Sequence, residues 1–175
     1  EGYLHFPFGD THLYELKNPP PYLFAPALVR SVPAGEDDLP LLKQPDFDPE
    51  QAAVLSGPLP EGFSPSPSGP PAHLRYSLLQ DDPDDEAFKV GLDQKSLVVF
   101  SEVIFPGWKA WVDGRPGTLY TADHALRSLF LDAGEHQVEF RYQPLWFKPI
   151  IAGAGLWLLS LVVFGFFFRT KNKDL

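Results

Sequence analysis

The chain has 175 residues, a formal net charge of −9 and no cysteine. The acidic balance excludes a nucleic-acid-binding class, which needs a basic face, and disfavours a protein that lies flat on anionic lipid. The absence of cysteine excludes disulfides, thiolate chemistry and cysteine-ligated metals. The 20 prolines are clustered, which favours a domain rich in loops and strands rather than in helices.

The sequence begins at Glu1 and contains no methionine. We therefore expect it to be part of a longer translation product, from which a signal peptide was removed or in which earlier membrane spans precede it. Before its apolar C-terminal segment there is room for one outer domain or two small ones. No element is predicted for residues 1–9, where Pro7 interrupts a group of aromatic and apolar residues.

Residues 1–56 are predicted to form N-terminal strands and one short helix of the outer domain. Two strands are predicted, over 11–16 and 22–32, because the prolines at 19–21 between them cannot donate to a strand ladder. The short helix is predicted for 46–55. Its Asp-Pro-Glu-Gln sequence combines an N-cap, a proline at the first helical position and a capping box.

Residues 57–72 are rich in proline, serine and glycine and predict a linker or a long surface loop. A proline-rich docking peptide for an SH3-like partner is the alternative, although no basic residue flanks the segment. A strand is predicted for 74–80. The carboxylates within 81–86 are interpreted as a solvated acidic turn, because they lack the alternate spacing and the glycine of an EF-hand calcium loop.

Residues 73–145 are predicted to fold as an antiparallel β-sandwich of the jelly-roll or immunoglobulin-like type. Short strands alternate with turns in this region, over 88–92, 96–105, 108–112, 126–131 and 136–142. The segment 96–105 is nearly all apolar, which predicts a central strand covered on both faces. The dipeptide Asp113-Gly114 predicts a type I′ hairpin turn.

Residues 149–168 hold no charge, and a helix of that length rises about 30 Å, the thickness of the hydrocarbon core of a bilayer. We predict a transmembrane helix for 146–168 and a basic cytoplasmic tail for 169–175, because cations directly after a span mark its cytoplasmic side. A buried helix of a soluble protein is the alternative. The predicted membrane-interface anchors are Trp146, Phe147, Lys148, Arg169 and Lys171.

Small residues gather at the outer end of the predicted span, at Ala152, Gly153, Ala154 and Gly155. Small side chains let a second helix approach closely. We therefore expect this helix to pack against other transmembrane helices, of the same parent protein or of a larger complex, as well as to contact the lipid bilayer.

No catalytic, cofactor-binding or metal site is predicted. The histidines form neither an i, i+4 pair nor a His-Glu-x-x-His motif, and there is no glycine-rich phosphate loop. Two weaker alternatives stay open. Asp123 and His124 could join a serine in a catalytic triad, and Glu102 could join Asp113 as a carboxylate pair for glycoside hydrolysis.

Glu102 lies on an apolar strand and needs a partner if it is buried, which Lys109 or Arg127 could supply in a structural ion pair. Trp108 and Trp111 are expected to share one face of their strand. They are interpreted as part of the sandwich core. The alternative is an exposed aromatic platform for a sugar, a lipid headgroup or a partner subunit.

Two linked blocks carry a family resemblance: Ser-Glu-Val-Ile-Phe-Pro-Gly-Trp-Lys-Ala-Trp-Val-Asp-Gly at 101–114 and Ala-Gly-Glu-His-Gln-Val-Glu-Phe-Arg-Tyr at 133–142. With the apolar segment that follows, they resemble the C-terminal end of YfhO-like bacterial membrane proteins. In that family a Pro-Gly-Trp-Lys turn, a Val-Asp-Gly hairpin and a Gly-x-His-x-Val strand precede the last transmembrane helix. Segments 13–18 and 46–55 are also similar to the outer domain of the family, so the resemblance covers about 11–168.

The resemblance implies an outer domain and final helix in the bacterial cytoplasmic membrane, with the domain extracytoplasmic and the C-terminus cytoplasmic. The family is similar to membrane glycosyltransferases that take a sugar from a polyprenyl-phosphate carrier. Their essential acid lies in an early extracytoplasmic loop that has no counterpart in this sequence, so no family site residue is carried over. The 57–71 insert and the acidic turn depart from the family pattern.

Three functions are compatible with this sequence. The leading one is a non-catalytic extracytoplasmic domain that binds or scaffolds and is anchored by one helix. The second is the ordered fragment of an intact polyprenyl-phosphate-sugar-dependent glycosyltransferase. The third is a single-pass accessory subunit that stabilises a larger membrane complex.

Overall fold

The computed structural model describes residues 3–8, 11–16, 21–49, 51–61, 63, 70–144, 149–151 and 153–161, and for 3–16 it describes the backbone only. A helix covers 149–151 and 153–161. The other elements are β1 (Tyr3–Phe8), β2 (Thr11–Leu16), β3 (Leu23–Phe24), β4 (Leu28–Val32), α1 (Leu39–Leu42), β5 (Ala52–Ser56), β6 (Leu74–Asp82), β7 (Asp85–Leu92), β8 (Ser96–Val103), β9 (Trp108–Val112), β10 (Arg115–Gly117), β11 (Tyr120–Ala122), β12 (Leu126–Leu131) and β13 (Gly134–Tyr142).

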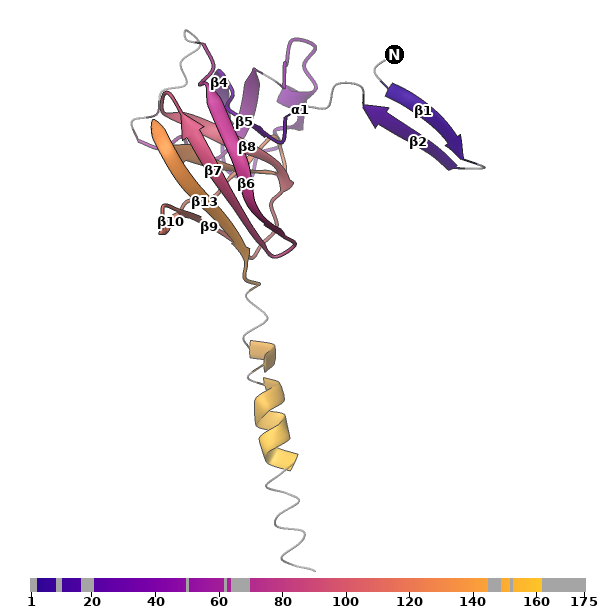
Figure 1. The fold of residues 1–175 in the computed structure, drawn as a ribbon, viewed down its shortest axis with the longest axis vertical. Coiled ribbons are helices and arrows are strands. Elements are labelled where there is room, and N and C mark those ends of the chain that lie inside the picture. Colours follow the sequence, from indigo (N-terminus) through magenta and orange to yellow (C-terminus); the bar gives the residue numbers. More distant parts are fainter. Residues whose placement is uncertain are drawn as a thin grey trace, which may run out of the picture.

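Two mostly antiparallel sheets form the body of the molecule (Figure 1). One has five strands in the order β10-β9-β13-β7-β6, and the other has six in the order β3-β8-β12-β11-β5-β4. Strands β1 and β2 pair in a separate two-stranded sheet. The mainly β prediction is confirmed, but the six-stranded sheet is mixed, because β4 and β5 are parallel and α1 lies in the crossover between them.

The two sheets share one core. Phe88 of β7 and Phe140 of β13 meet Phe100 of β8, and each of the three side chains is at most 1% exposed. The rings of Phe100 and Phe140 pack edge to face, with centroids 4.7 Å apart. Because these residues come from both sheets, the sheets pack face to face in a β-sandwich-like arrangement.

A second apolar cluster covers the opposite face of the six-stranded sheet. Leu97 and Val99 of β8 point into it, whereas their neighbours on β8 point into the first core. Phe63 and Phe130 close over it with ring centroids 4.5 Å apart. The prediction of a strand covered on both faces is therefore confirmed for β8, although the strand ends at Val103 rather than at residue 105.

The helix predicted for 46–55 is wrong. A single turn does form after Asp48, whose carbonyl accepts bonds from the amides of Gln51 and Ala52. The chain then continues as β5, whose first four residues are all buried. Its place between β4 and β11 supplies ladder partners on both sides, and this outweighs a helix signal too short to sustain itself. The short helix is instead α1, which carries Pro40 in its first turn.

Other boundaries differ in ways that follow local chemistry. The predicted strand 22–32 is divided at Pro26 into β3 and β4. Most of the acidic run belongs to the paired strands β6 and β7, and only residues 83 and 84 form the turn between them. The Asp113-Gly114 hairpin is confirmed, with φ values of 53° and 74° between β9 and β10.

The C-terminal helix extends away from the sandwich (Figure 1). Among the described residues, no helix combines the length and the hydropathy that a membrane crossing requires. The predicted span 146–168 lies partly outside the described residues. The predicted anchors Trp146, Phe147, Lys148, Arg169 and Lys171 all lie outside them. The transmembrane assignment stays a prediction.

Candidate functional site

The chain leaves the sandwich through a tightly held segment after β13. The amide of Gln143 donates to the carbonyl of Gly107 at 2.7 Å, and the amide of Tyr142 donates to the carbonyl of Asp84 at 2.8 Å. Gly107 has φ +118°, and a Cβ there would lie 3.0 Å from the Cα of Pro144. The β8–β9 and β6–β7 turns therefore fix the direction in which the chain exits toward its helix.

Trp108 and Trp111 do not share a face, so this expectation is wrong. They are three positions apart, and side chains alternate along a strand. Trp108 packs against the sandwich core, and its ring lies 5.4 Å from that of Tyr142. Trp111 lies on the outer face of the sheet, where the guanidinium of Arg141 sits 5.1 Å from its ring. The geometry does not bring the two indoles together into one aromatic platform.

A buried arginine lies close to the chain exit. Arg127 is 1% exposed, and its guanidinium lies over the rings of Trp108 and Phe140, at 4.2 Å and 4.8 Å from their centroids. Its Nη2 donates to Glu86 Oε1 at 3.0 Å. Within the described residues, Arg127 Nε and Nη1 and Glu86 Oε2 have no hydrogen-bond partner. The aromatic rings take the place of oxygen acceptors on the arginine.

Glu102 completes this cluster from the surface. Its Oε2 lies 3.6 Å from Arg127, so the predicted structural ion pair forms with Arg127. Lys109, the other predicted partner, is exposed. The hydroxyl of Tyr22 donates to Glu102 Oε1 at 3.0 Å. Burial, followed by this bond to a carboxylate, raises the pKa of Tyr22 well above its usual range, so it stays a neutral donor.

Asp113 and His136 form a second polar contact in the five-stranded sheet, at the end where β13 begins. Asp113 Oδ2 lies 2.8 Å from His136 Nδ1, and its Oδ1 accepts the amide of Gln137 at 2.8 Å. His136 Nε2 also lies 3.1 Å from the carbonyl of Asp132. Asp113 is therefore bonded to the start of β13, whereas Glu102 contacts Arg127 and Tyr22.

The pKa values of this pair move apart. The amide of Gln137, followed by the bond to His136, lowers the pKa of Asp113. At His136 burial acts to lower the pKa, but the bonds to Asp113 and Asp132 outweigh it and raise the pKa overall. Both shifts favour the charged pair, which fits a structural clamp between the β9–β10 turn and the start of β13.

Asp38 and His124 meet at the edge of the six-stranded sheet. Asp38 is 1% exposed, its Oδ1 lies 2.7 Å from His124 Nδ1, and its Oδ2 accepts the amide of His124 and the hydroxyl of Ser56. The imidazole of His124 is bonded to Asp38, and Asp123 accepts the amide of Val54 instead, so the described residues do not place Asp123 and His124 in the relation that a catalytic triad requires. With Asp37, these two side chains could hold a metal ion, since their ligand atoms lie within 4.8 Å of one another.

Asp123, next to this group, accepts the amide of Val54 at 2.8 Å and has φ 48°. Burial raises the pKa of Asp123 to about 6, and the charge of Asp38 adds to the rise, whereas the bond from Val54 opposes it. Only the dipeptide Asp123-His124 pointed to this cluster in the sequence. Asp38 comes from a distant loop, and no local pattern marked it.

The helix over 149–151 and 153–161 is an apolar surface in the described structure. Its large side chains are exposed, from Ile150 and Ile151 to Trp157 at 63%. Gly153 and Gly155 have open space around the position of a Cβ. Ala152 lies outside the described residues. A helix that is apolar on every side requires lipid or protein cover.

Comparison of the chain with family models, curated proteins and solved structures gives no match.

Proposed function

We propose that this chain is a non-catalytic extracytoplasmic domain that binds or scaffolds a partner and is anchored in a membrane by one C-terminal helix. The exposed apolar helix is the observation that carries the proposal. Seven of its large hydrophobic side chains are uncovered in the described structure, namely Ile150, Ile151, Leu156, Trp157, Leu158, Leu159 and Leu161. Lipid tails or neighbouring apolar helices are the surroundings that such a helix needs.

The anchor continues beyond the described helix. The uncharged sequence runs from Pro149 to Phe168, and basic residues follow it at once. In this proposal the span is 146–168, the small residues Ala152, Gly153, Ala154 and Gly155 pack against other transmembrane helices, and the tail 169–175 is cytoplasmic. The cationic tail is the feature that supports this orientation.

The segment at the end of β13, Tyr142 and Gln143, supports a scaffolding role. The amides of Tyr142 and Gln143 are bonded to two turns of the sandwich, so the domain itself holds the end of β13 and the residue that follows it. Asp38 is paired with His124, and Arg127 is paired with Glu86 and covered by aromatic rings, so contacts within the domain favour a structural role for both residues.

The location follows from the resemblance to YfhO-like proteins. We propose that the domain lies outside the cytoplasmic membrane of a bacterium and that its sandwich is a variant of the jelly-roll or immunoglobulin-like arrangement. The lipid bilayer and other transmembrane helices are the proposed partners of the anchor. A role as an accessory subunit or as part of a glycosyltransferase-like protein would use the same anchor.

Liposome flotation of the purified full chain tests the anchor. The wild-type chain should float with vesicles of neutral lipid and should resist extraction by alkaline carbonate. The double variant Leu158→Arg/Leu159→Arg places two charges near the middle of the proposed span, at a cost of about 2.5–3.5 kcal/mol each, and should remain in the soluble fraction.

Leu158→Ala/Leu159→Ala is the matched control, because it shortens the same two side chains without adding charge. This variant should float like the wild type. Flotation of the arginine variant, or failure of the wild type to float, would contradict the proposed anchor.

A further inference from the structure

Within the described part of the chain, strand β6 is the outer strand of the five-stranded sheet and pairs only with β7. It runs from Leu74 to Asp82, and every residue after Leu74 is exposed. A long strand with one unpaired edge presents a row of free backbone N–H and C=O groups, which can accept another strand. The ladder is regular over 74–78, and an irregularity follows between Leu78 and Gln80.

The side chains on the inner face of this edge are uncovered. Tyr76 and Leu78 lie opposite Val90 and Phe88, which are buried in the core. Residues opposite each other on paired strands share a face, so Tyr76 and Leu78 point to the core side. They are nevertheless 42% and 48% exposed. The reason is that the facing edge of the other sheet is β3, which has only two residues.

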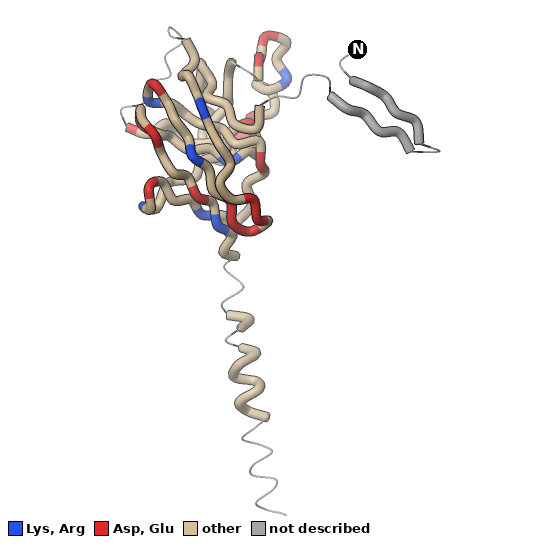
Figure 2. Tube along the Cα trace, in the orientation of Figure 1, with Lys and Arg blue, Asp and Glu red and all other residues tan. Residues whose placement is uncertain are grey.

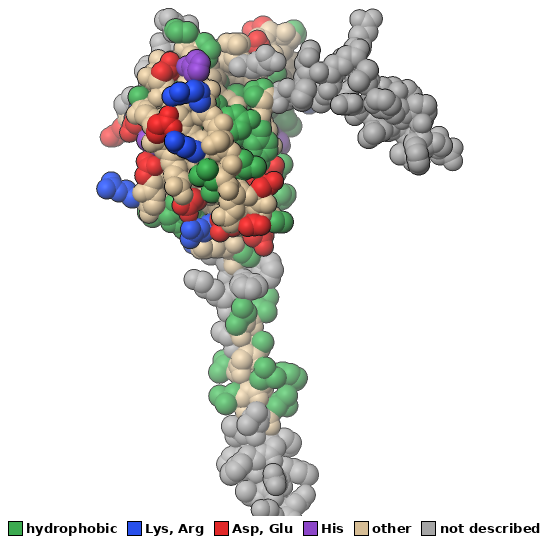
Figure 3. All heavy atoms as spheres, viewed as in Figure 1, with side chains coloured by type: hydrophobic (Ala, Val, Ile, Leu, Met, Phe, Trp, Pro, Cys, Tyr) green, Lys and Arg blue, Asp and Glu red, His purple; other side chains and the backbone are tan. Residues whose placement is uncertain are grey.

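An apolar groove lies between these two edge strands. It is lined by residues of β3, of β6 and of the segments beside them, among them Pro21, Leu23, Phe24, Ala72, Leu74 and Tyr76. Figure 3 shows uncovered hydrophobic side chains on the face that carries β6. A strand added to β6 would place every second side chain over this groove.

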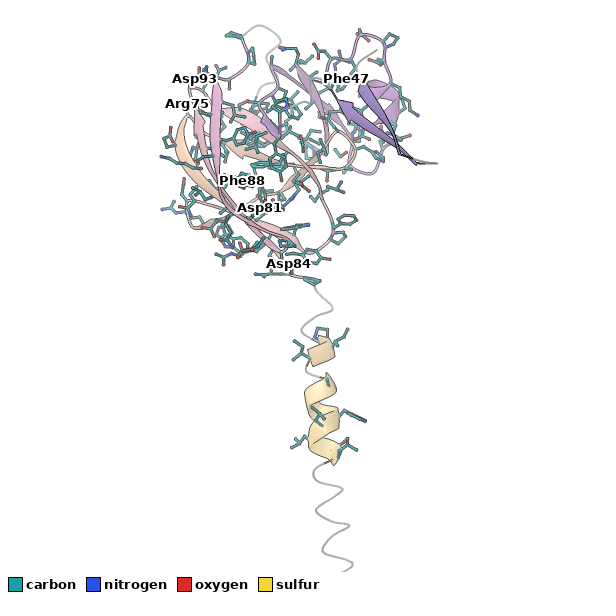
Figure 4. All side chains as sticks on the ribbon, turned by 45° about the vertical axis from the view of Figure 1, so that its right-hand side comes forward. Phe47, Arg75, Asp81, Asp84, Phe88 and Asp93 are labelled. Carbon is teal, nitrogen blue, oxygen red and sulfur yellow. The ribbon has the colours of Figure 1, made fainter. Side chains whose placement is uncertain are left out.

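Negative charge marks one end of the same edge. Asp81, Asp82 and Asp84 are exposed, and within the described residues none of them has a cationic partner. Figure 2 shows this acidic group at the end of the sandwich from which the chain leaves. In Figure 4, Arg75 lies at the opposite end of β6 from Asp81 and Asp84. The edge therefore combines apolar side chains along the strand with negative charge at its C-terminal end.

We infer that the β6 edge binds an extended segment of a partner polypeptide, in which apolar side chains alternate and lysine or arginine residues lie beside Asp81, Asp82 and Asp84. The backbone of the segment pairs with β6, its apolar side chains cover Tyr76 and Leu78, and its cations neutralise the acidic end. This inference rests on the proposed binding role and specifies the chemistry of the partner. It does not involve the membrane anchor.

Fluorescence anisotropy with labelled peptides tests the inference on the full chain in dodecyl maltoside micelles. The probes are Lys-Lys-Lys-Val-Thr-Val-Thr-Val-Thr, its reverse sequence, and versions of both with glutamate in place of lysine. If the peptide pairs antiparallel to β6, the first sequence places its lysines beside Asp82. If it pairs parallel to β6, the reverse sequence does so. One lysine peptide should bind about 10-fold more tightly than its glutamate version at low salt.

Two controls separate strand addition from attraction by charge alone. In a strand, alternate amides of the peptide face β6, so N-methylation of one alternate set should abolish binding and methylation of the other set should leave it unchanged. The variant Asp81→Asn/Asp82→Asn/Asp84→Asn should remove the preference for lysine. Its matched control, Glu36→Gln/Asp46→Asn/Glu61→Gln, removes three exposed acids elsewhere and should retain the preference.

Absence of binding by every peptide, equal affinity for lysine and glutamate versions, or tolerance of both methylated sets would overturn the inference. Self-association of the chain in which hydrogen exchange shows protection of the β6 amides would assign the edge to a second copy instead, and would also overturn it. Liposome flotation reports on the anchor independently, so failure of peptide binding and failure of the membrane proposal are distinguishable.

Discussion

Asp113 and His136 lie 23 residues apart in the chain and meet through a 2.8 Å contact between Oδ2 of the aspartate and Nδ1 of the histidine. Asp113 sits in the hairpin turn after β9, and His136 lies near the start of β13. The same carboxylate also accepts the amide of Gln137. The contact therefore fixes the end of one hairpin against the beginning of the strand that leads to the chain exit.

This contact predicts a stability window in pH. The folded-state pKa of His136 is raised above 6.5, so its contribution is complete below pH 6.5 and is lost as pH rises through that raised pKa. The folded-state pKa of Asp113 is lowered below 3.8, so its contribution is present above pH 3.8 and is lost as pH falls through the lowered pKa. Together they should stabilise most between about pH 4 and 6.5.

Asp113→Asn tests this window, because asparagine tolerates the positive φ and keeps an acceptor for Gln137. It should lower the free energy of unfolding by up to about 1 kcal/mol at pH 5.5 and by less at pH 8.5, measured by denaturant titration. Asp46→Asn, at an exposed position, is the control and should have no pH-dependent effect. An equal loss at both pH values would contradict the ion pair.

Asp123 should show the opposite behaviour. Its folded-state pKa is raised to about 6 from 3.8, so the folded protein loses stability as pH rises from about 4 to 6 and the buried carboxyl ionises. Asp123→Asn keeps an oxygen acceptor for the amide of Val54 and accommodates φ 48°. The variant should be more stable than the wild type at pH 7, by about 1–3 kcal/mol.

Thermal or denaturant unfolding at pH 4 and pH 7 measures the effect. The wild type and Asp123→Asn should be similar at pH 4 and should differ at pH 7. A variant that is less stable at pH 7 would show that the ionised carboxylate contributes favourably at this position.

The Arg127–Glu86 pair predicts a non-additive mutant series. Arg127→Met leaves the mostly buried carboxylate of Glu86 without its cation and should destabilise the fold by about 3–5 kcal/mol. Arg127→Met/Glu86→Gln removes both charges and should recover more than about 1 kcal/mol of that loss. Denaturant unfolding of the two single variants and the double variant completes the cycle. Strict additivity would mean that the two charges do not interact.

Local sequence patterns predicted the strands whose alternating side chains and flanking turn residues lie within the segment itself. The predicted strands 11–16, 108–112 and 126–131 match β2, β9 and β12, because alternation and turn residues lie within each segment. The Asp113-Gly114 turn was predictable for the same reason, since both positions need a positive φ. The sequence also showed that Trp108 and Trp111 lie on opposite faces of their strand, because positions three apart on a strand face opposite sides.

Features that depend on distant partners had no such signal. Ala52 to Leu55 suit a helix locally and become a strand because β4 and β11 pair with that segment. Arg127 is surrounded by leucine and serine in the sequence, and its partners Glu86 and Trp108 come from two other strands. The uncovered edge of β6 depends on the short length of β3, a strand that prolines limit on both sides.

Gly153 and Gly155 test the packing of the C-terminal helix. Neither has an atom of the described structure within 4 Å of a Cβ position, so Gly153→Leu/Gly155→Leu should leave the unfolding of the sandwich unchanged. If the helix packs against other spans through its small residues, the variant should weaken association with them in membranes. Crosslinking in native membranes measures this, with Leu158→Ala/Leu159→Ala as the control. Unchanged crosslinks would contradict small-residue packing.

Gly107 and Gly114 separate steric contact from backbone strain at the chain exit. Both have positive φ, but a Cβ at Gly107 would meet Pro144 and the ring of Tyr142 at 3.0 Å, whereas a Cβ at Gly114 meets nothing within 4 Å. Gly114→Ala should therefore report strain alone, about 1 kcal/mol, and Gly107→Ala should be more destabilising. Because the carbonyl of Gly107 accepts the amide of Gln143, Gly107→Ala should also accelerate hydrogen exchange at that amide. Equal effects of the two variants would mean that the β8–β9 turn does not hold the exit segment.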